Sequence, residues 1–181
     1  MTKFLRMTSL AATVAALALT ATPASAQSVV SASPQAKAKA KVLRALTLTR
    51  TADLDFGTIV LSGAGAWASE IVTVNSAGAL TACGTTNLTC SAPATGYSAA
   101  AYNVTGSNNA VVAISVPASV TMSNGAGGTI SVNLAGAPTS LTLTNSGAPG
   151  SPFSFGGSIT LASTTADGDY TADIAVTVDY Q

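Results

Sequence analysis

The residue types that usually perform catalysis are scarce in this chain, which has 181 residues and no histidine. Histidine is the commonest general base and metal ligand near neutral pH, so its absence removes the usual centre of acid–base or metal chemistry. Serines and threonines are abundant, but no base lies beside them in the sequence, and the GxSxG nucleophile motif does not occur. We therefore expect a protein that is not an enzyme, with no catalytic residue, no metal and no cofactor.

Two pairs of carboxylates have a spacing that could support chemistry. Asp53 and Asp55, in the sequence DLD, would project to one side of a strand and could begin an acid–base pair. Asp167 and Asp169, in DGD, could offer oxygen ligands to calcium. A solvated strand face and a turn are the more common roles of such pairs, so we assign neither site.

The N-terminus has the three parts of a secretory signal peptide. Lys3 and Arg6 supply a positive start, residues 7–19 are apolar and uncharged, and Ala24-Ser25-Ala26 is a small-residue cleavage site. The apolar run is too short to span a bilayer as an anchor, and no second long apolar run follows. We predict that residues 1–26 are removed on export and that no membrane span remains.

The two cysteines, Cys83 and Cys90, lie in the sequence CGTTNLTC. An even pair at this spacing in an exported protein predicts a disulfide, which would contribute roughly 2–3 kcal/mol. A metal or redox pair is disfavoured, because the spacing is not C-x-x-C and no histidine could complete the site.

Charge divides the predicted mature chain into two parts. Five of the seven Lys and Arg residues lie between positions 37 and 50, and none follows Arg50. All seven Asp and Glu residues lie after it. We therefore treat residues 27–41 as an N-terminal extension and residues 42–181 as one domain.

The extension contains the alternating sequence AKAKAKV. On a helix its lysines would lie all round the axis, whereas on a strand they share one face and the small apolar residues share the other. A solvated basic tail and an arm for nucleic acid remain alternatives, the latter weakened by the lack of aromatic residues. We favour a strand whose lysines keep an unpaired edge soluble. Its apolar face comprises Ala36, Ala38, Ala40 and Val42.

Beyond the extension, short runs rich in Thr, Val and Ile alternate with Gly, Pro, Asn and Ser. This composition favours strands over helices, and the regular turn signals predict an all-β sandwich or barrel. The candidate strands are 42–49, 54–61, 70–75, 100–106, 110–116, 119–123, 129–134, 140–145, 155–162 and 169–180. The last alternates most strictly, which predicts one buried face and one wet face. Its apolar face comprises Tyr170, Ala172, Ile174, Val176, Val178 and Tyr180.

Four of these segments carry a resemblance to a known family. LDFGTIV at 54–60, AAYNVTG at 100–106, FSFGGSITL at 153–161 and GDYTADIAVTVDY at 168–180 resemble, in this order, a secreted bacterial family catalogued as domain of unknown function 4402. That family is similar to subunits of the Mat/Ecp-type common pilus and, more loosely, to other chaperone–usher pilins. Ala172 departs from the pattern, in which we expect a glycine.

The C-terminus strengthens the resemblance. Usher-assembled pilins end in an alternating strand with a penultimate aromatic residue and a glycine fourteen residues from the end, and Tyr180 and Gly168 occupy these positions. The resemblance implies an immunoglobulin-like antiparallel β-sandwich, pilin-like, whose groove is completed by a donated strand. The last strand, from Gly168 through Tyr180, would then be the assembly strand beside that groove.

The function implied by the resemblance is a pilin-like, fimbrial subunit that assembles into a fibre by donor-strand exchange. A periplasmic chaperone and an usher would be its partners, and the 36–42 segment of the next subunit would be the donor. The location would be the periplasm, the cell surface or the exterior of a Gram-negative bacterium, with no nucleic acid bound. The alternative is a monomeric secreted or surface β-sandwich that acts as a binding or adhesion module.

Overall fold

The computed structural model describes residues 30–63, 65–81, 83, 85–91 and 96–181. The chain divides into two units, Met1–Ala40 and Lys41–Gln181, which we describe separately. In the first unit, residues 30–40 are exposed and contain no helix or strand. No helix in the described part of the chain is long and apolar enough to cross a membrane.

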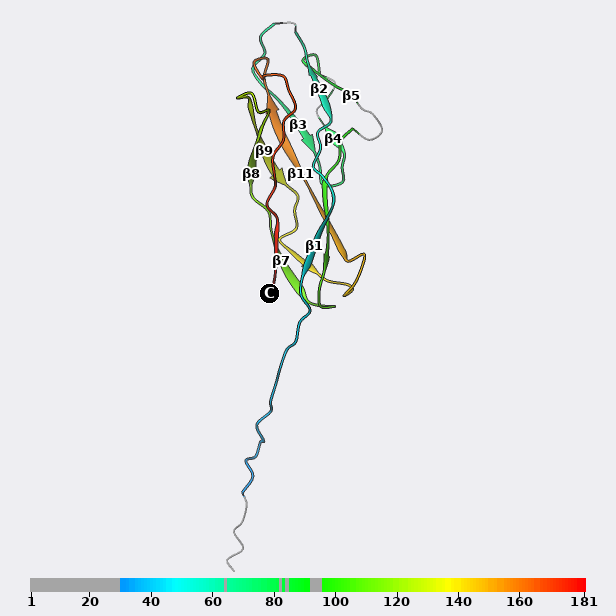
Figure 1. Ribbon diagram of the computed structural model, residues 1–181, viewed down its shortest axis with the longest axis vertical. Helices are drawn as coiled ribbons and strands as arrows, with labels where there is room; N and C mark the ends of the chain where they lie inside the picture. The colour runs from blue at the N-terminus through cyan, green and yellow to red at the C-terminus, as the bar shows by residue number, and fades with distance from the viewer. Residues whose placement is uncertain (1–29, 64, 82, 84, 92–95) are drawn as a thin grey trace, which may run out of the picture. The chain divides into compact units, whose positions relative to one another are not determined.

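The second unit is built of strands, and its described residues contain no helix (Figure 1). The strands are β1 Thr47–Ala52, β2 Thr58–Leu61, β3 Glu70–Val74, β4 Leu80–Thr81, β5 Leu88–Ser91, β6 Ala100–Thr105, β7 Val111–Ser115, β8 Ser119–Ser123, β9 Thr129–Ala135, β10 Ser140–Thr142, β11 Ser151–Leu161 and β12 Thr177–Tyr180. The largest sheet has the order β1-β6-β11-β3-β4, with β9 paired to β11 and β8 to β9. Two smaller sheets, β10-β7-β12 and β2-β5, complete the unit.

Strand β11 connects the two halves of the largest sheet. Its first half, Ser151 to Phe155, pairs with β6, and its second half, from Gly156 onward, pairs with β3 and β9. The change of partner occurs at two buried glycines, Gly156 and Gly157. A Cβ atom at Gly156 would lie 2.0 Å from the carbonyl oxygen of Val74, so the close approach of β3 requires glycine there.

Each half of the unit has its own apolar core. One core lies along β3, β9 and the second half of β11, and its most deeply buried members include Val72, Val74 and Val132. The other lies between β6 and β7 and includes Val104, Val112 and Phe155. All strand pairs are antiparallel. The predicted all-β antiparallel sandwich is therefore confirmed.

Several predicted strand limits are wrong. The strand expected at 42–49 begins at Thr47, because residues 41–45 are exposed and form no ladder with another described strand. The strand expected at 169–180 forms a ladder only over Thr177–Tyr180, preceded by a single bridge between Ser123 and Thr171. Strands β4 and β5 were not predicted, because their short polar sequences carry little alternation.

Candidate functional site

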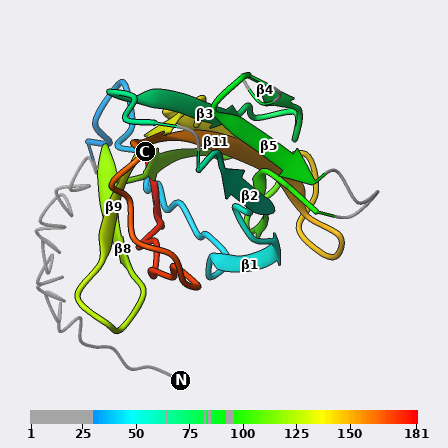
Figure 2. The ribbon, with the colours of Figure 1, turned by 90° about the horizontal axis from the view of Figure 1, so that it is seen from above.

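A groove of about 480 Å³ lies in the body between two extended segments. One rim comprises Arg50 and residues 52–56, which continue from β1, and the other comprises residues 170–174 of the C-terminal segment. The floor consists of side chains from β6, β8 and β9, namely Ala100, Tyr102, Val120, Met122 and Val132. Figure 2 views the body from above, with the C-terminal segment in orange-red and red beside the β8–β9 hairpin.

The C-terminal rim is extended but unpaired along much of its length. Thr171 exchanges backbone hydrogen bonds with Ser123 at distances of 3.0 and 3.1 Å. After this bridge, residues 172–176 make no backbone hydrogen bond to another described residue, and pairing with β7 resumes at Thr177. Exposed, unpaired backbone groups of this kind are a template for pairing with another strand.

The start of the C-terminal rim is fixed by the turn between β8 and β9. The Asn124 side chain donates a 3.1 Å hydrogen bond to the carbonyl oxygen of Asp167. The Tyr170 hydroxyl donates to the carbonyl oxygen of Ala166 at 2.8 Å. Gly168 has a φ of 132°, and a Cβ atom there would lie 3.1 Å from the Asn124 side chain. The rim therefore leaves this turn in a defined direction.

The other rim alternates between inward apolar and outward acidic residues. Leu54 is half-buried and Phe56 is buried, whereas Asp53 and Asp55 are exposed. Asp55 exchanges two 2.9 Å backbone hydrogen bonds with Ser98, which fixes this segment on the side away from the groove. In an extended segment, consecutive residues direct their backbone groups to opposite sides. The backbone groups of Leu54 and Phe56 are therefore those that face the groove.

Tyr102 forms part of the floor and stacks on two phenylalanines. Its ring centroid lies 5.4 Å from that of Phe153 and 6.0 Å from that of Phe155. Burial raises the pKa of the Tyr102 hydroxyl above its usual value, Arg50 partly opposes this shift, and Asp53 adds to it. The floor therefore favours a neutral tyrosine.

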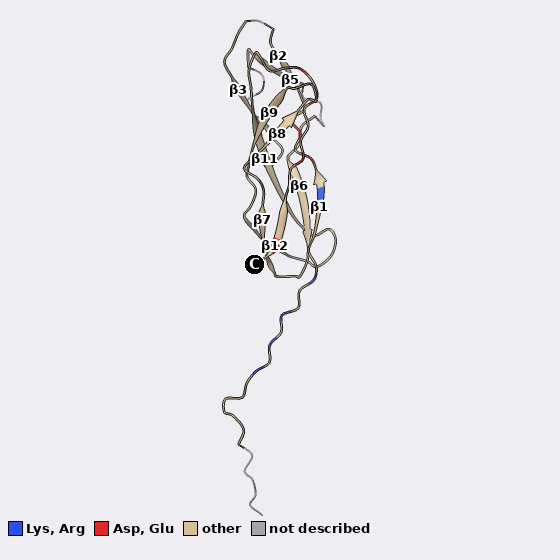
Figure 3. Ribbon diagram, turned by 60° about the vertical axis from the view of Figure 1, so that its left-hand side comes forward, with Lys and Arg blue, Asp and Glu red and all other residues tan. Residues whose placement is uncertain are grey.

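The outer edge of the groove carries exposed carboxylates. Arg50 forms an ion pair with Asp53, the only ion pair among the described residues. Asp55 and Asp173 are exposed on opposite rims and have no cation paired with them in the described part of the chain. Figure 3 shows Lys and Arg in blue only in the N-terminal part of the described chain and Asp and Glu in red only after it.

At the far end of the body, Tyr180 connects three segments. Its hydroxyl donates to the carbonyl oxygen of Arg44 at 2.7 Å and accepts from the backbone N–H of Ser107 at 2.7 Å. Its ring packs with Leu46 against the core between β6 and β7. Tyr180 therefore holds the beginning of the body and the end of the chain against the same core.

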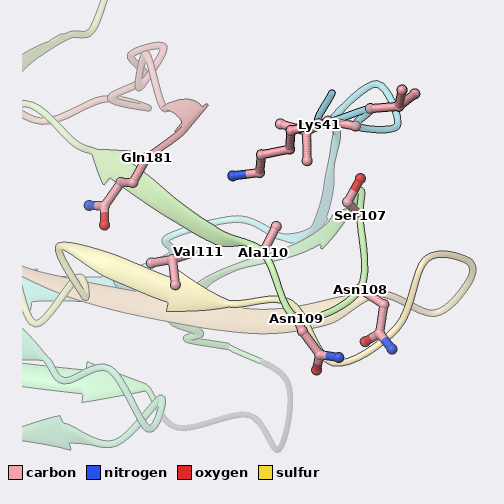
Figure 4. Close-up of a pocket in the computed structure, with 9 residues that line it drawn as sticks. Lys41, Ser107, Asn108, Asn109, Ala110, Val111 and Gln181 are labelled. Carbon is pink, nitrogen blue, oxygen red and sulfur yellow. The ribbon is translucent and has the colours of Figure 1, made fainter. Parts of the chain in front are cut away.

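A second hollow, of about 540 Å³, lies near this end (Figure 4). Residues 41–43, residues 107–111 and Gln181 line it. In Figure 4, Lys41 points into the space between Ser107 and Gln181. The polar side chains that line it carry amides, a hydroxyl and one ammonium group, so it offers several hydrogen-bonding groups.

The predicted disulfide is confirmed: Cys83 and Cys90 are bonded, with their Cα atoms 5.6 Å apart.

On the apolar face predicted for the last strand, Ala172 is exposed, whereas the other five residues are half-buried. Ala172 is more exposed than predicted because it lies in the unpaired stretch between the Thr171–Ser123 bridge and the start of β12 at Thr177.

Other predicted residues fall outside the groove or outside the described chain. Ala36, Ala38, Ala40 and Val42 are exposed and pair with no strand in the described part of the chain, so their role as a donor strand stays a prediction. The expected cleavage point before Gln27 lies outside the described residues. Asp167 and Asp169 are exposed, and no group of three or more His, Cys, Asp or Glu residues in the described part of the chain could hold a metal ion.

The groove itself was only partly foreseen from sequence. The resemblance pointed to an opening beside the last strand, but not to Leu54 and Phe56 as its other rim or to Tyr102 and Met122 as its floor. The alternation of DLDF was the one available signal, since it places two apolar residues on one side and two carboxylates on the other.

The described residues define the class of protein as an all-β antiparallel sandwich, with a groove beside its C-terminal segment. Within that class, the chain matches the family described as Domain of unknown function (DUF4402) over residues 46–180, and it belongs to this family. No curated protein and no solved structure matches the chain.

Proposed function

We propose that this protein is an exported, non-enzymatic structural subunit that assembles into a fibre by strand donation. Removal of residues 1–26 would deliver the chain to the periplasm, and a chaperone would occupy the groove until an usher replaced it with the next subunit. The extension of that next subunit, through Ala36, Ala38, Ala40 and Val42, would be the donor. Tyr170 through Tyr180 would form the accepting edge.

The observation that carries this proposal is the open groove beside residues 172–176. These residues are extended and lack backbone partners in the described chain, and residues 172–174 line the groove beside its apolar floor. A strand inserted there would pair backbone groups and cover apolar side chains at once, as in other cases of strand addition. The exposed, alternating segment at 36–42 has the pattern such a strand requires.

Assembly of the mature chain, residues 27–181, tests this function. Ala38→Asp should abolish oligomers seen by size-exclusion chromatography and electron microscopy, because it places an unpaired carboxylate in an apolar groove. The matched substitution Lys39→Gln changes the outward face and should leave assembly almost unaffected. Normal assembly of the Ala38→Asp chain would refute strand donation by this segment.

A second candidate is a monomeric secreted or surface module that binds a ligand. The hollow lined by Asn108, Asn109 and Gln181 favours it, because amide side chains suit recognition of hydroxyl-rich ligands such as sugars. A wild-type mature chain that stays monomeric at high concentration, and in the presence of its chaperone and usher, would support this alternative.

A further inference from the structure

We propose that the groove selects its incoming strand by charge: the outward carboxylates of its two rims pair with the outward lysines at positions 37, 39 and 41 of a second copy. This inference rests on the proposed function, since it specifies which feature of the donated strand the same groove recognises.

The rims present their carboxylates where an inserted strand would present its outer side chains. Asp55 alternates with the inward Leu54 and Phe56, and Asp173 precedes the half-buried Ile174. Both carboxylates are exposed and line the groove. Side chains on the same face of neighbouring strands are direct neighbours, and opposite charges in these positions attract.

The extension matches the groove in sign. Its lysines recur at every second position, about 7 Å apart on a strand, so they share one face. With the alanines directed at the floor, every lysine would lie between the two rims.

The small size of the inward residues explains why charge would matter. An alanine side chain is a single methyl group, so Ala36, Ala38 and Ala40 cover little apolar surface and discriminate weakly among strands. The lysines supply the discrimination that these alanines lack. Arg50 neutralises Asp53 through its ion pair, which leaves Asp55 and Asp173 as the principal acceptors.

The distribution of charge along the chain provides the complementary partner. Lysine occurs at only three positions after the predicted signal peptide, and all three lie in the AKAKAKV segment. All acidic residues belong to the body that follows. A second copy of the chain therefore carries the basic strand that an acidic groove would favour, whereas a neutral or acidic strand would be disfavoured.

Binding of synthetic peptides to the full mature chain tests this selection. The acceptor carries Ala38→Asp, so that its own segment cannot occupy a groove, and the probe is a fluorescent peptide of residues 27–42. Replacing its three lysines by glutamine should weaken binding about tenfold at about 20 mM salt. The two peptides should bind equally at about 1 M salt, where charge is screened.

Variants of the groove provide the matched half of the experiment. Asp55→Asn combined with Asp173→Asn should remove the preference for the lysine peptide, whereas Asp167→Asn, an exposed carboxylate outside the groove, should retain it. Asp55→Lys combined with Asp173→Lys should instead favour a peptide with glutamate at the three positions. This charge exchange also excludes misfolding as the cause of lost binding.

Four outcomes would overturn the proposal. Equal binding of the lysine and glutamine peptides at low salt would show that the rims do not select a strand by its charge. The same would follow if the acceptor with Asp55→Lys and Asp173→Lys did not prefer the glutamate peptide. Equal binding of a peptide with the same composition but scrambled order would indicate attraction for any cationic chain. No binding of either peptide would refute strand donation itself, and this inference with it.

Discussion

At the scale of single residues, Tyr180 shows how the end of the chain is fixed to its beginning. Its hydroxyl makes two 2.7 Å hydrogen bonds, to Arg44 and from Ser107, which lie 136 and 73 residues away in sequence. A Cβ atom at Gly106 would lie 2.5 Å from this hydroxyl, so the neighbouring glycine makes room for it. Tyr180 therefore fixes the end of the chain against the core between β6 and β7.

Two substitutions of Tyr180 should destabilise the body to different extents. Tyr180→Phe removes both hydrogen bonds and should lower the free energy of unfolding by about 1–2 kcal/mol. Tyr180→Ala also removes the packed ring and should cost about 3 kcal/mol. The exposed Asp167 is the control, because Asp167→Asn should cost less than about 0.5 kcal/mol. Urea denaturation measures all three, and equal stability would mean that the ring is not part of the core.

Sequence predicted the position of Tyr180 on the inward face, because alternation from Ile174 to Tyr180 is strict. It could not predict the partners of the hydroxyl. These are backbone groups of distant segments, and no local pattern records which distant backbone groups the fold brings together.

At the scale of elements, β11 determines how the two halves of the body join. It is the longest strand, and its pairing passes from β6 to β3 and β9 at Gly156. The sequence FSFGGSITL contains the two glycines that permit this change. A residue with a side chain would collide with the backbone of β3.

Gly156→Ala should therefore destabilise the body by several kcal/mol, since the added Cβ atom would lie 2.0 Å from the Val74 carbonyl oxygen. Gly147→Ala is the matched control, because nothing lies within 4 Å of the added atom. Thermal unfolding of both variants checks the prediction. A Gly156→Ala chain as stable as the Gly147→Ala chain would show that β3 and β11 are not this close.

The sequence predicts strands well where apolar and polar residues alternate and a partner strand is present, as for β8 and β9. It fails where the presence of a partner strand depends on the tertiary fold. Residues 169–176 alternate as well as a ladder strand does, yet they pair only at Thr171. Alternation reports which side of a segment is apolar, but not whether a neighbouring strand is present. The unpaired part of the C-terminal rim was therefore beyond prediction from its own sequence.

At the scale of the whole molecule, the proposed assembly depends on one groove and one extension. The two rims come from segments more than a hundred residues apart, and the residues of the floor come from three strands. Sequence resemblance suggested such a groove, but the identity of its lining required the fold. The extension, by contrast, is assigned from its alternating basic sequence alone, and its role as a donor stays a prediction.

Covalent trapping of the extension in the groove of another copy tests strand donation most directly. Two mature chains of different mass are mixed, one carrying Ala38→Cys and the other Ala172→Cys, a position on the groove rim. Oxidation should produce a mixed dimer whose linked peptides contain positions 38 and 172, identified by mass spectrometry. A partner chain with Ala68→Cys, exposed and outside the groove, should give little of this product. Equal yields from Ala68→Cys and Ala172→Cys, or a link that forms only within a single chain carrying both cysteines, would contradict donation between subunits.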